Sequence, residues 1–333
     1  MENIDAKNLN DSMIVCDAHC DTAMRITNEG FNIGVKSSTG HVDIPRLIEG
    51  EVGVQVFACW IGKPGEPSDH YSALAKQMIN DLYTQFGTNF GEIHPVLSAK
   101  DIQIANQNGK IAAVIGIEGG QAIEDSLYML DVFYGLCVRI MTIVWGSTNW
   151  ADASQDPVKH NGLTSFGKRV IKEMNRLGMI VDVSHSSDKT TWDVLETSSN
   201  PIIASHSCAQ AICGHARNIN DELIKAVSQA NGVICVNFCP AFLDEDYRKG
   251  NKTDPPSIDK VIEHIEHIAN IGGIDCVGIG SDYDGMAPAP IGLEDVSKLP
   301  NIAKKLIERG YKKDDVAKIM GGNFLRIFNN VCR

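Results

Sequence analysis

The segment IAAVIGIEGGQAIEDSLYMLDVFYGLCVRIMTIV, residues 111–144, contains the pattern that decides the fold. Two apolar runs of strand length, residues 111–117 and 138–144, lie on either side of a helical pattern at residues 125–136. Both runs are continuously apolar rather than alternating, which is typical of parallel strands buried on both faces. Parallel strands need a crossover connection, and a helix is its usual form. The segment therefore predicts a strand–helix–strand unit.

The same alternation extends along the whole chain. Further apolar runs predict strands at residues 14–16, 53–60, 179–184, 201–205, 232–238 and 276–281. Between them lie helical patterns such as SALAKQMINDLYTQF (72–86), SFGKRVIKEMNRLG (165–178) and SIDKVIEHIEHIANIGG (257–273). Eight strand–helix units without a Pro/Ser-rich linker favour an α/β fold with one domain over residues 1–333, a closed (β/α)8 barrel of the TIM type. An open, doubly wound sheet remains the alternative.

Composition and charge narrow the classes of partner. The 333 residues carry a formal net charge of -12 without a cluster of Lys and Arg, which argues against a nucleic-acid partner. The N-terminal segment 1–13 has no apolar signal region, and no run has the roughly 20 apolar residues of a membrane span. The ten cysteines lack the spacing of a zinc ribbon and are expected to be reduced, mostly buried thiols. We therefore expect a soluble, cytoplasmic protein that does not associate with a membrane.

Ionisable residues follow the predicted strands, where a barrel of this type carries its chemistry. The groups concerned are three imidazoles and three carboxylates: His19, Asp21, Glu118, His185, His206 and Asp282. Crowding them onto one rim would be costly unless a cation neutralised the acids and occupied the imidazole lone pairs. Nitrogen and oxygen ligands without thiolate suit zinc or a similar divalent metal. Two metals bridged by one carboxylate would use six such groups better than a single ion.

We also expect particular roles for two segments outside the predicted strands. Arg217, in the irregular segment CGHARNIN (213–220), is a candidate bidentate clamp for a substrate carboxylate, with a structural salt bridge as the alternative. The segment HIEH, from His264 to His267, lacks the spacing of a zinc-binding HExxH helix. It is expected to be a partly exposed helix face.

Several motifs in order resemble the membrane dipeptidase (renal dipeptidase) family of two-zinc peptidases, and within it the soluble bacterial members. The resemblance covers nearly the whole chain and runs through DAHCDT (17–22), IEGGQAIEDSLYMLDVFYGLCVR (117–139), NWADAS (149–154), LTSFGKRVIKEMNRLGMIVDVSHSSDKT (163–190), PIIASHSCAQAICGHARNINDE (201–222) and GIGSDYDGM (278–286). It implies a barrel that hydrolyses dipeptides, including those with a D-residue at the carboxyl side, through a metal-bridging hydroxide. A homodimer is also suggested by the resemblance.

The resemblance further assigns site residues. It implies one zinc held by His19, Asp21 and Glu118 and a second held by Glu118, His185 and His206, so that Glu118 bridges the metals. Asp282 would handle the proton of the bridging water, and Arg217 would bind substrate. Trp145 stands where many members have a histidine that holds the scissile carbonyl oxygen or the oxyanion.

Two other classes of protein are alternatives to the dipeptidase. A deaminase or cyclic-amide hydrolase generally has an HxH pair and a bridging lysine, whereas this chain has HCD at residues 19–21 and a Glu as the bridge candidate. A non-catalytic metal-binding relative is the other class. The presence of Asp282 argues against it, and Trp145 is its only support.

Overall fold

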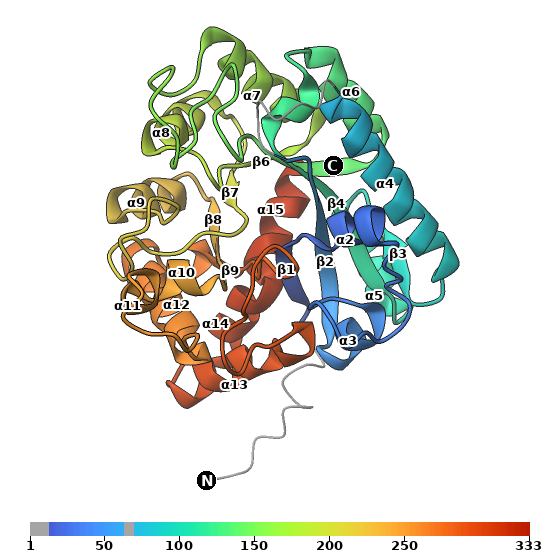
Figure 1. The fold of residues 1–333 in the computed structure, drawn as a ribbon, viewed down its shortest axis with the longest axis vertical. Coiled ribbons are helices and arrows are strands. Elements are labelled where there is room, and N and C mark those ends of the chain that lie inside the picture. Colours follow the sequence, from blue (N-terminus) through green and yellow to red (C-terminus); the bar gives the residue numbers. More distant parts are fainter. Residues whose placement is uncertain (1–12, 63–69) are drawn as a thin grey trace.

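The strands form one parallel sheet that curves into a barrel (Figure 1). The computed structural model describes residues 13–62 and 70–333. Within this part of the chain the sheet runs in the order β1-β2-β4-β5-β6-β7-β8-β9, and β3 pairs with β4 off this path. The strands are β1 (Val15–Cys20), β2 (Val52–Trp60), β3 (Ile93–Pro95), β4 (Ile111–Glu118), β5 (Val138–Thr142), β6 (Ile180–Asp182), β7 (Ile203–Ala204), β8 (Val233–Val236) and β9 (Val277–Ile279).

The barrel closes where the residues after β9 meet the end of β1. Cys20 and Tyr283 form an isolated parallel bridge. The Asp21 N–H donates to the Tyr283 carbonyl at 2.8 Å, and the Asp282 N–H donates to the His19 carbonyl at 3.2 Å. The predicted (β/α)8 barrel of the TIM type is confirmed, and its seam runs through the candidate site.

Helices surround the sheet (Figure 1). Their ends follow local capping rules: the Thr164 side chain accepts from the Gly167 N–H at the start of α7, and Gly178 ends this helix with φ 83°. The helices are α2 (Thr22–Glu29), α3 (Ile44–Glu49), α4 (Tyr71–Thr88), α5 (Ala99–Gln107), α6 (Leu127–Gly135), α7 (Ser165–Leu177), α8 (Asp188–Thr197), α9 (Asp221–Gln229), α10 (Pro240–Leu243), α11 (Glu245–Arg248), α12 (Ile258–Gly272), α13 (Pro300–Glu308), α14 (Lys313–Ala317) and α15 (Asn323–Val331).

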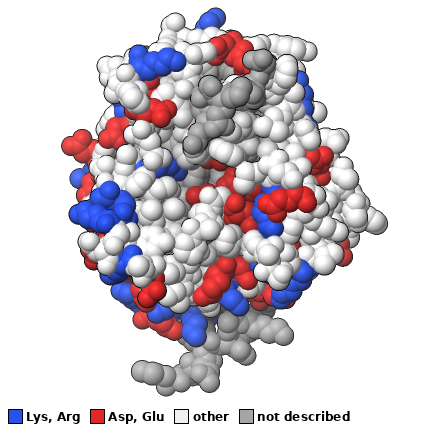
Figure 2. Space-filling model, viewed as in Figure 1, with Lys and Arg blue, Asp and Glu red and all other residues white. Residues whose placement is uncertain are grey.

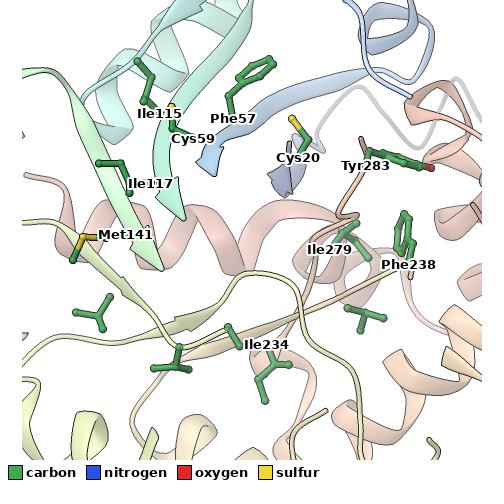
Figure 3. Packing of buried hydrophobic residues seen from close by; sticks show 14 of the residues in the cluster. Cys20, Phe57, Cys59, Ile115, Ile117, Met141, Ile234, Phe238, Ile279 and Tyr283 are labelled. Carbon is green, nitrogen blue, oxygen red and sulfur yellow. The ribbon is translucent and has the colours of Figure 1, made fainter. Parts of the chain in front are cut away.

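Alternate residues of each strand enter two separate apolar clusters. On β4, Ile115 and Ile117 belong to the cluster between the sheet and the surrounding helices, which Figure 3 shows together with Phe57 and Cys59 of β2. Val114 belongs instead to a cluster inside the barrel, which also contains residues of α15. Because side chains alternate along a strand, the inward position of Val114 also places Glu118 on the inner face.

The structure adds details that the apolar runs did not predict. Strand β1 extends through Cys20, so His19 lies within the strand rather than after it. The short β3 pairs with residues 111–113 of β4. The pairing of β5 with β4 begins two residues later, at Ile115. Within residues 13–62 and 70–333, none of the helices has the length and apolar character needed to cross a membrane.

Candidate active site

The six predicted side chains converge at the end of the barrel to which the strands point. His19 lies near the end of β1 and Glu118 is the last residue of β4, while the others lie in the loops that begin just after their strands. All of them are buried or nearly so, which is unusual for six ionisable groups in close contact. The remaining members are Asp21, His185, His206 and Asp282.

Glu118 lies at the centre of this group. Its Oε1 is 2.8 Å from His185 Nε2 and 3.4 Å from His206 Nε2, and its Oε2 is 3.5 Å from His19 Nε2. Each carboxylate oxygen therefore faces a different set of imidazoles. This is the arrangement expected of a carboxylate that bridges two metals.

The remaining distances complete two sets of ligand atoms. His185 Nε2 and His206 Nε2 are 2.9 Å apart, so they form one compact set with Glu118 Oε1. His19 Nε2 is 3.6 Å from Asp21 Oδ2, and His19, Asp21 and Asp282 also lie within reach of one ion. His19 Nε2 and Asp21 Oδ1 are buried without a hydrogen-bond partner. Buried polar atoms without a partner, on an imidazole and a carboxylate, fit a site for a divalent cation.

The protonation of these groups is shaped by burial and by their mutual contacts. Burial would raise the pKa of Glu118, but the charge of His19, and then the close contacts with His185 and the other imidazoles, lower it well below its usual range. Burial, and then the charge of Arg217, lowers the pKa of His185 to about 4, and burial also lowers the pKa of His206. His185 and His206 are thus neutral beside an ionised carboxylate, the form in which both can bind a metal. For His19, burial lowers the pKa but Glu118 and Asp21 raise it well above its usual value.

A buried hydrogen-bond chain orients His206. Ser205 Oγ donates to Asp182 Oδ2 at 2.6 Å and lies 2.8 Å from His206 Nδ1. Because the single hydroxyl hydrogen goes to the carboxylate, Nδ1–H of His206 must be the donor to Ser205. The lone pair of His206 then lies on Nε2, which faces Glu118. Neither Asp182 nor Ser205 was among the predicted site residues.

A second buried carboxylate fastens the barrel seam. Asp17 accepts from the Ser281 N–H at 2.8 Å, from Ser281 Oγ at 2.6 Å and from Gln55 Nε2 at 3.1 Å. These bonds tie the segment after β9 to β1 directly beneath Asp282. The only sequence signal for Asp17 and Asp182 is a carboxylate inside an apolar run.

The backbone is unusual at the site. His185 and Asp282 have φ values of 69° and 65°, in the left-handed region that non-glycine residues seldom adopt. A Cβ atom at Gly285 would lie 1.9 Å from Asp21 Oδ2 and 2.6 Å from Asp282 Oδ1, so a side chain there would displace these carboxylates. Asn237 Nδ2 donates to Asp282 Oδ2 at 2.9 Å. Strain of this kind clusters at functional sites.

Arg217 and Trp145 occupy different depths of the site. Arg217 is 3% exposed, donates from one terminal nitrogen to the His206 carbonyl at 3.0 Å, and has a buried Nε without a partner. The Trp145 ring lies 5.7 Å from the ring of His185 and 5.5 Å from that of Trp60. Arg217 thus lies behind the imidazoles, and Trp145 lies beside them.

A cavity of about 310 Å³ opens above these groups. Its lining combines the ionisable Asp21, Glu118, His185 and Asp282 with apolar side chains. The volume is in the range of small-ligand sites. Figure 2 shows Asp and Glu side chains gathered near the centre of the face viewed in Figure 1. The apolar members of the lining are Met24, Trp60, Trp145, Cys239 and Phe242.

The expectation that the segment HIEH is a partly exposed helix face holds for His267 but is wrong for His264. His264 is fully buried rather than partly exposed: its Nδ1 accepts from the Ala209 N–H and its Nε2 donates to the Leu243 carbonyl, both at 3.0 Å. His267 lies nearer the surface and pairs with Asp221 at 2.7 Å. The helical period alone did not reveal that loops cover the His264 side of α12.

A (β/α)8 barrel with imidazoles and carboxylates gathered at the carboxyl ends of its strands belongs to the class of barrel metallohydrolases. Residues 4–333 match the family described as membrane dipeptidase (peptidase family M19). The chain belongs to this family and is a metallo-dipeptidase. This match supports the peptidase prediction over a deaminase or cyclic-amide hydrolase.

Individual relatives agree with the family match. Dipeptidase tcpJ of Claviceps purpurea is 34% identical over 306 residues, which cover 89% of this chain and 70% of the relative. Dipeptidase aclJ of Aspergillus oryzae is 35% identical over 303 residues, which cover 88% of this chain and 70% of the relative. Among solved structures, a metallopeptidase from Rhodobacter sphaeroides, liganded with a phosphinate mimic of L-Ala-D-Ala, has a TM-score of 0.87 and 26% identity, covering 96% of this chain and all of its own. The structure of the dipeptidase AC, a metallopeptidase of family M19, has a TM-score of 0.87 and 27% identity, and the match covers 96% of this chain and 99% of that protein.

Proposed function

We propose that this chain cleaves the peptide bond of dipeptides, including those with a D-residue at the carboxyl side, with two zinc ions as its cofactors. The observation that carries the proposal is the position of Glu118, whose two oxygens face His19 on one side and His185 with His206 on the other. The Rhodobacter sphaeroides relative, with its ligand mimicking L-Ala-D-Ala, supports the choice of substrate.

The donor atoms divide between two ions. His19, Asp21 and Glu118 would hold one, and Glu118, His185 and His206 the other, although other divalent metals suit the same ligands. When bound, such ions supply a hydroxide nucleophile near neutral pH and polarise the scissile carbonyl. The chain's own part is to keep both imidazoles after β6 and β7 neutral and aimed at Glu118.

Asp282 is the proposed proton carrier. Its Oδ2 accepts from Asn237, which holds the carboxylate in place at the cavity wall. Burial raises its pKa, so the carboxylate is a better base than an exposed aspartate. In this role Asp282 accepts the proton of the attacking water and returns it to the leaving nitrogen.

Arg217 and Trp145 are the proposed substrate-binding residues. The unpartnered Nε of Arg217 is a buried donor that a substrate carboxylate would satisfy. Trp145 forms part of the cavity wall beside His185. In this assignment Arg217 fixes the carboxyl end of the dipeptide and Trp145 borders its scissile bond.

Elemental analysis combined with a dipeptide panel tests the proposal. Purified protein should contain about two metals per chain, and it should cleave both L,L and L,D dipeptides. Cleavage should stop after chelation and return after zinc is restored, which controls for damage by the chelator. Full cleavage by the metal-free protein, or a metal-loaded protein that cleaves no dipeptide, would contradict the proposal.

We also propose a cytoplasmic location and a homodimer. All ten cysteines are free thiols, eight of them buried, which supports a reducing compartment. The homodimer rests on the family resemblance. Sedimentation equilibrium would test it, and a mass of a single chain at micromolar concentration would contradict it.

A further inference from the structure

Two indole rings form one wall of the cavity. Trp60 is the last residue of β2 and pairs in register with Glu118, while Thr142 of β5 pairs with Glu118 from the other side. Trp145 follows β5 by three residues. The two tryptophans therefore come from the strands on either side of the central carboxylate.

The indoles are fixed by aromatic contacts. The ring centroids of Trp60 and Trp145 are 5.5 Å apart with an interplanar angle of 64°, an edge-to-face arrangement. Trp145 also lies against His185, with a ring separation of 5.7 Å. Separations of 4.5–7 Å in edge-to-face geometry are the favourable ones for aromatic pairs. A third aromatic or apolar group could extend this cluster from the cavity side, since both indoles line the cavity.

The opposite wall also carries an aromatic residue, Phe242, and Arg217 lies near its ring without being part of the cavity lining. The order of strands places β2 and β4 across the barrel from β7 and β8 (Figure 1). On that far side, Phe242 of α10 lines the cavity, and the guanidinium of Arg217 lies 5.5 Å from the centre of the Phe242 ring. If Arg217 holds the carboxyl end of a dipeptide, the residue before the scissile bond lies toward the two indoles.

We propose that Trp60 and Trp145 form a specificity-determining subsite for the side chain of the N-terminal residue, and that they select dipeptides with an aromatic or large apolar residue there. This inference rests on the proposed dipeptidase function and on the proposed role of Arg217. Burial of an apolar side chain against two indoles favours binding of such substrates over small ones. A cationic side chain could also be attracted to an indole face. The test therefore includes one.

The experiment compares kcat/KM for Phe-Ala, Ala-Ala, Ala-Phe and Lys-Ala in the zinc-loaded wild type and in Trp60→Ala and Trp60→Phe variants. Wild type should prefer Phe-Ala to the other three. Trp60→Ala should lower the ratio of Phe-Ala to Ala-Ala by about three- to tenfold, the size of one aromatic contact, and Trp60→Phe should keep most of it. The ratio is measured within one preparation, so a partly unfolded variant does not distort it.

Trp192→Ala is the matched control, because Trp192 is 36% exposed on α8 and lies outside the cavity lining. It should leave all ratios unchanged. An equal kcat/KM for Phe-Ala and Ala-Ala in wild type would overturn the inference while leaving the dipeptidase function intact. A wild-type preference for Ala-Phe or Lys-Ala, or a ratio that Trp60→Ala does not change, would overturn it as well. Failure to cleave any dipeptide would overturn the proposed function and this inference with it.

Discussion

Replacing Ser205 by alanine should weaken metal binding without removing a metal ligand. Ser205 Oγ connects Asp182 to His206 Nδ1 through contacts of 2.6 and 2.8 Å. Removal of this hydroxyl leaves His206 Nδ1–H without its acceptor in a buried position. The imidazole is then free to rotate or to move its hydrogen to Nε2, the nitrogen that faces Glu118.

The size of the effect follows from the partners that remain. Asp182 keeps the Thr142 hydroxyl and the N–H groups of Ser184 and Ser205, at 3.0 and 2.9 Å for the two N–H groups, so the carboxylate is not left unsatisfied. The loss therefore falls on His206 and, through a longer contact of 3.5 Å between Ser205 Oγ and Nδ1, on His19. One buried group without a partner costs about 1–3 kcal/mol of stability. Loss of an outer partner of a metal-binding histidine weakens metal affinity by about 10- to 100-fold.

Competition with a chromogenic chelator at pH 7.5 measures the zinc affinity, and urea unfolding of the metal-free protein measures stability. Ser281→Ala is the matched control: Ser281 Oγ donates to Asp17 Oδ2 at the same 2.6 Å, but its other contacts are backbone groups of His19 and Tyr283. Both variants should lose similar stability, and Ser205→Ala should lose more zinc affinity. A zinc affinity for Ser205→Ala within about twofold of the control, well short of the tenfold expected, would refute the reasoning.

Two further substitutions test other parts of the site, and a third tests a buried histidine outside it. Asp282→Asn should retain its metals by elemental analysis yet lose about 10²- to 10⁴-fold in kcat, because it removes the proposed proton carrier; normal turnover would exclude this role. Gly285→Ala should reduce metal content and activity, because its methyl group would lie 1.9 and 2.6 Å from the Asp21 and Asp282 carboxylates. Gly214→Ala is the control and should change neither quantity, since the nearest atom to its methyl group would be 3.8 Å away. Burial lowers the pKa of His264 to about 4, so folding keeps it neutral and its contribution to stability is lost as pH falls from about 6.5 towards 4. Between pH 7 and pH 5 the unfolding free energy of wild type should fall by roughly 2 kcal/mol more than that of His264→Gln; equal slopes in urea unfolding would contradict this.

Most of the barrel could be predicted because its strands are buried on both faces. Continuous apolar runs such as residues 111–117, when they alternate with helical patterns, are typical of buried parallel strands. Strand β3 escaped this reasoning because it has three residues, one of them Pro95, and needs only one partner strand. The true end of β1 was also missed, since Asp17 and His19 read as polar turn residues until their buried partners are known.

The candidate site, like the fold, could be predicted from the sequence only in part. Ligand types placed after successive strands were visible in the sequence, because parallel strands bring their carboxyl ends to one edge. The partners of those ligands were not visible, since Asp182 meets Ser205 only through the pairing of β6 with β7. The left-handed backbone of His185 and Asp282 was equally hidden, because these residue types give no local signal for it.

The two ends of the barrel differ in chemistry. Apolar residues fill one end of the barrel, and ionisable residues gather at the carboxyl ends of the strands. Phe324 and Phe328 of α15 belong to the apolar cluster inside the barrel that includes Val114, so this interior is apolar and stabilising. The other end carries buried carboxylates and left-handed residues such as His185 and Asp282, each of the latter costing about 1–3 kcal/mol. A substitution in the α15 cluster should therefore change stability while leaving selectivity intact. At the mouth, the same groups that destabilise the metal-free fold are those that a cation would satisfy, so metal binding and local stability are coupled there.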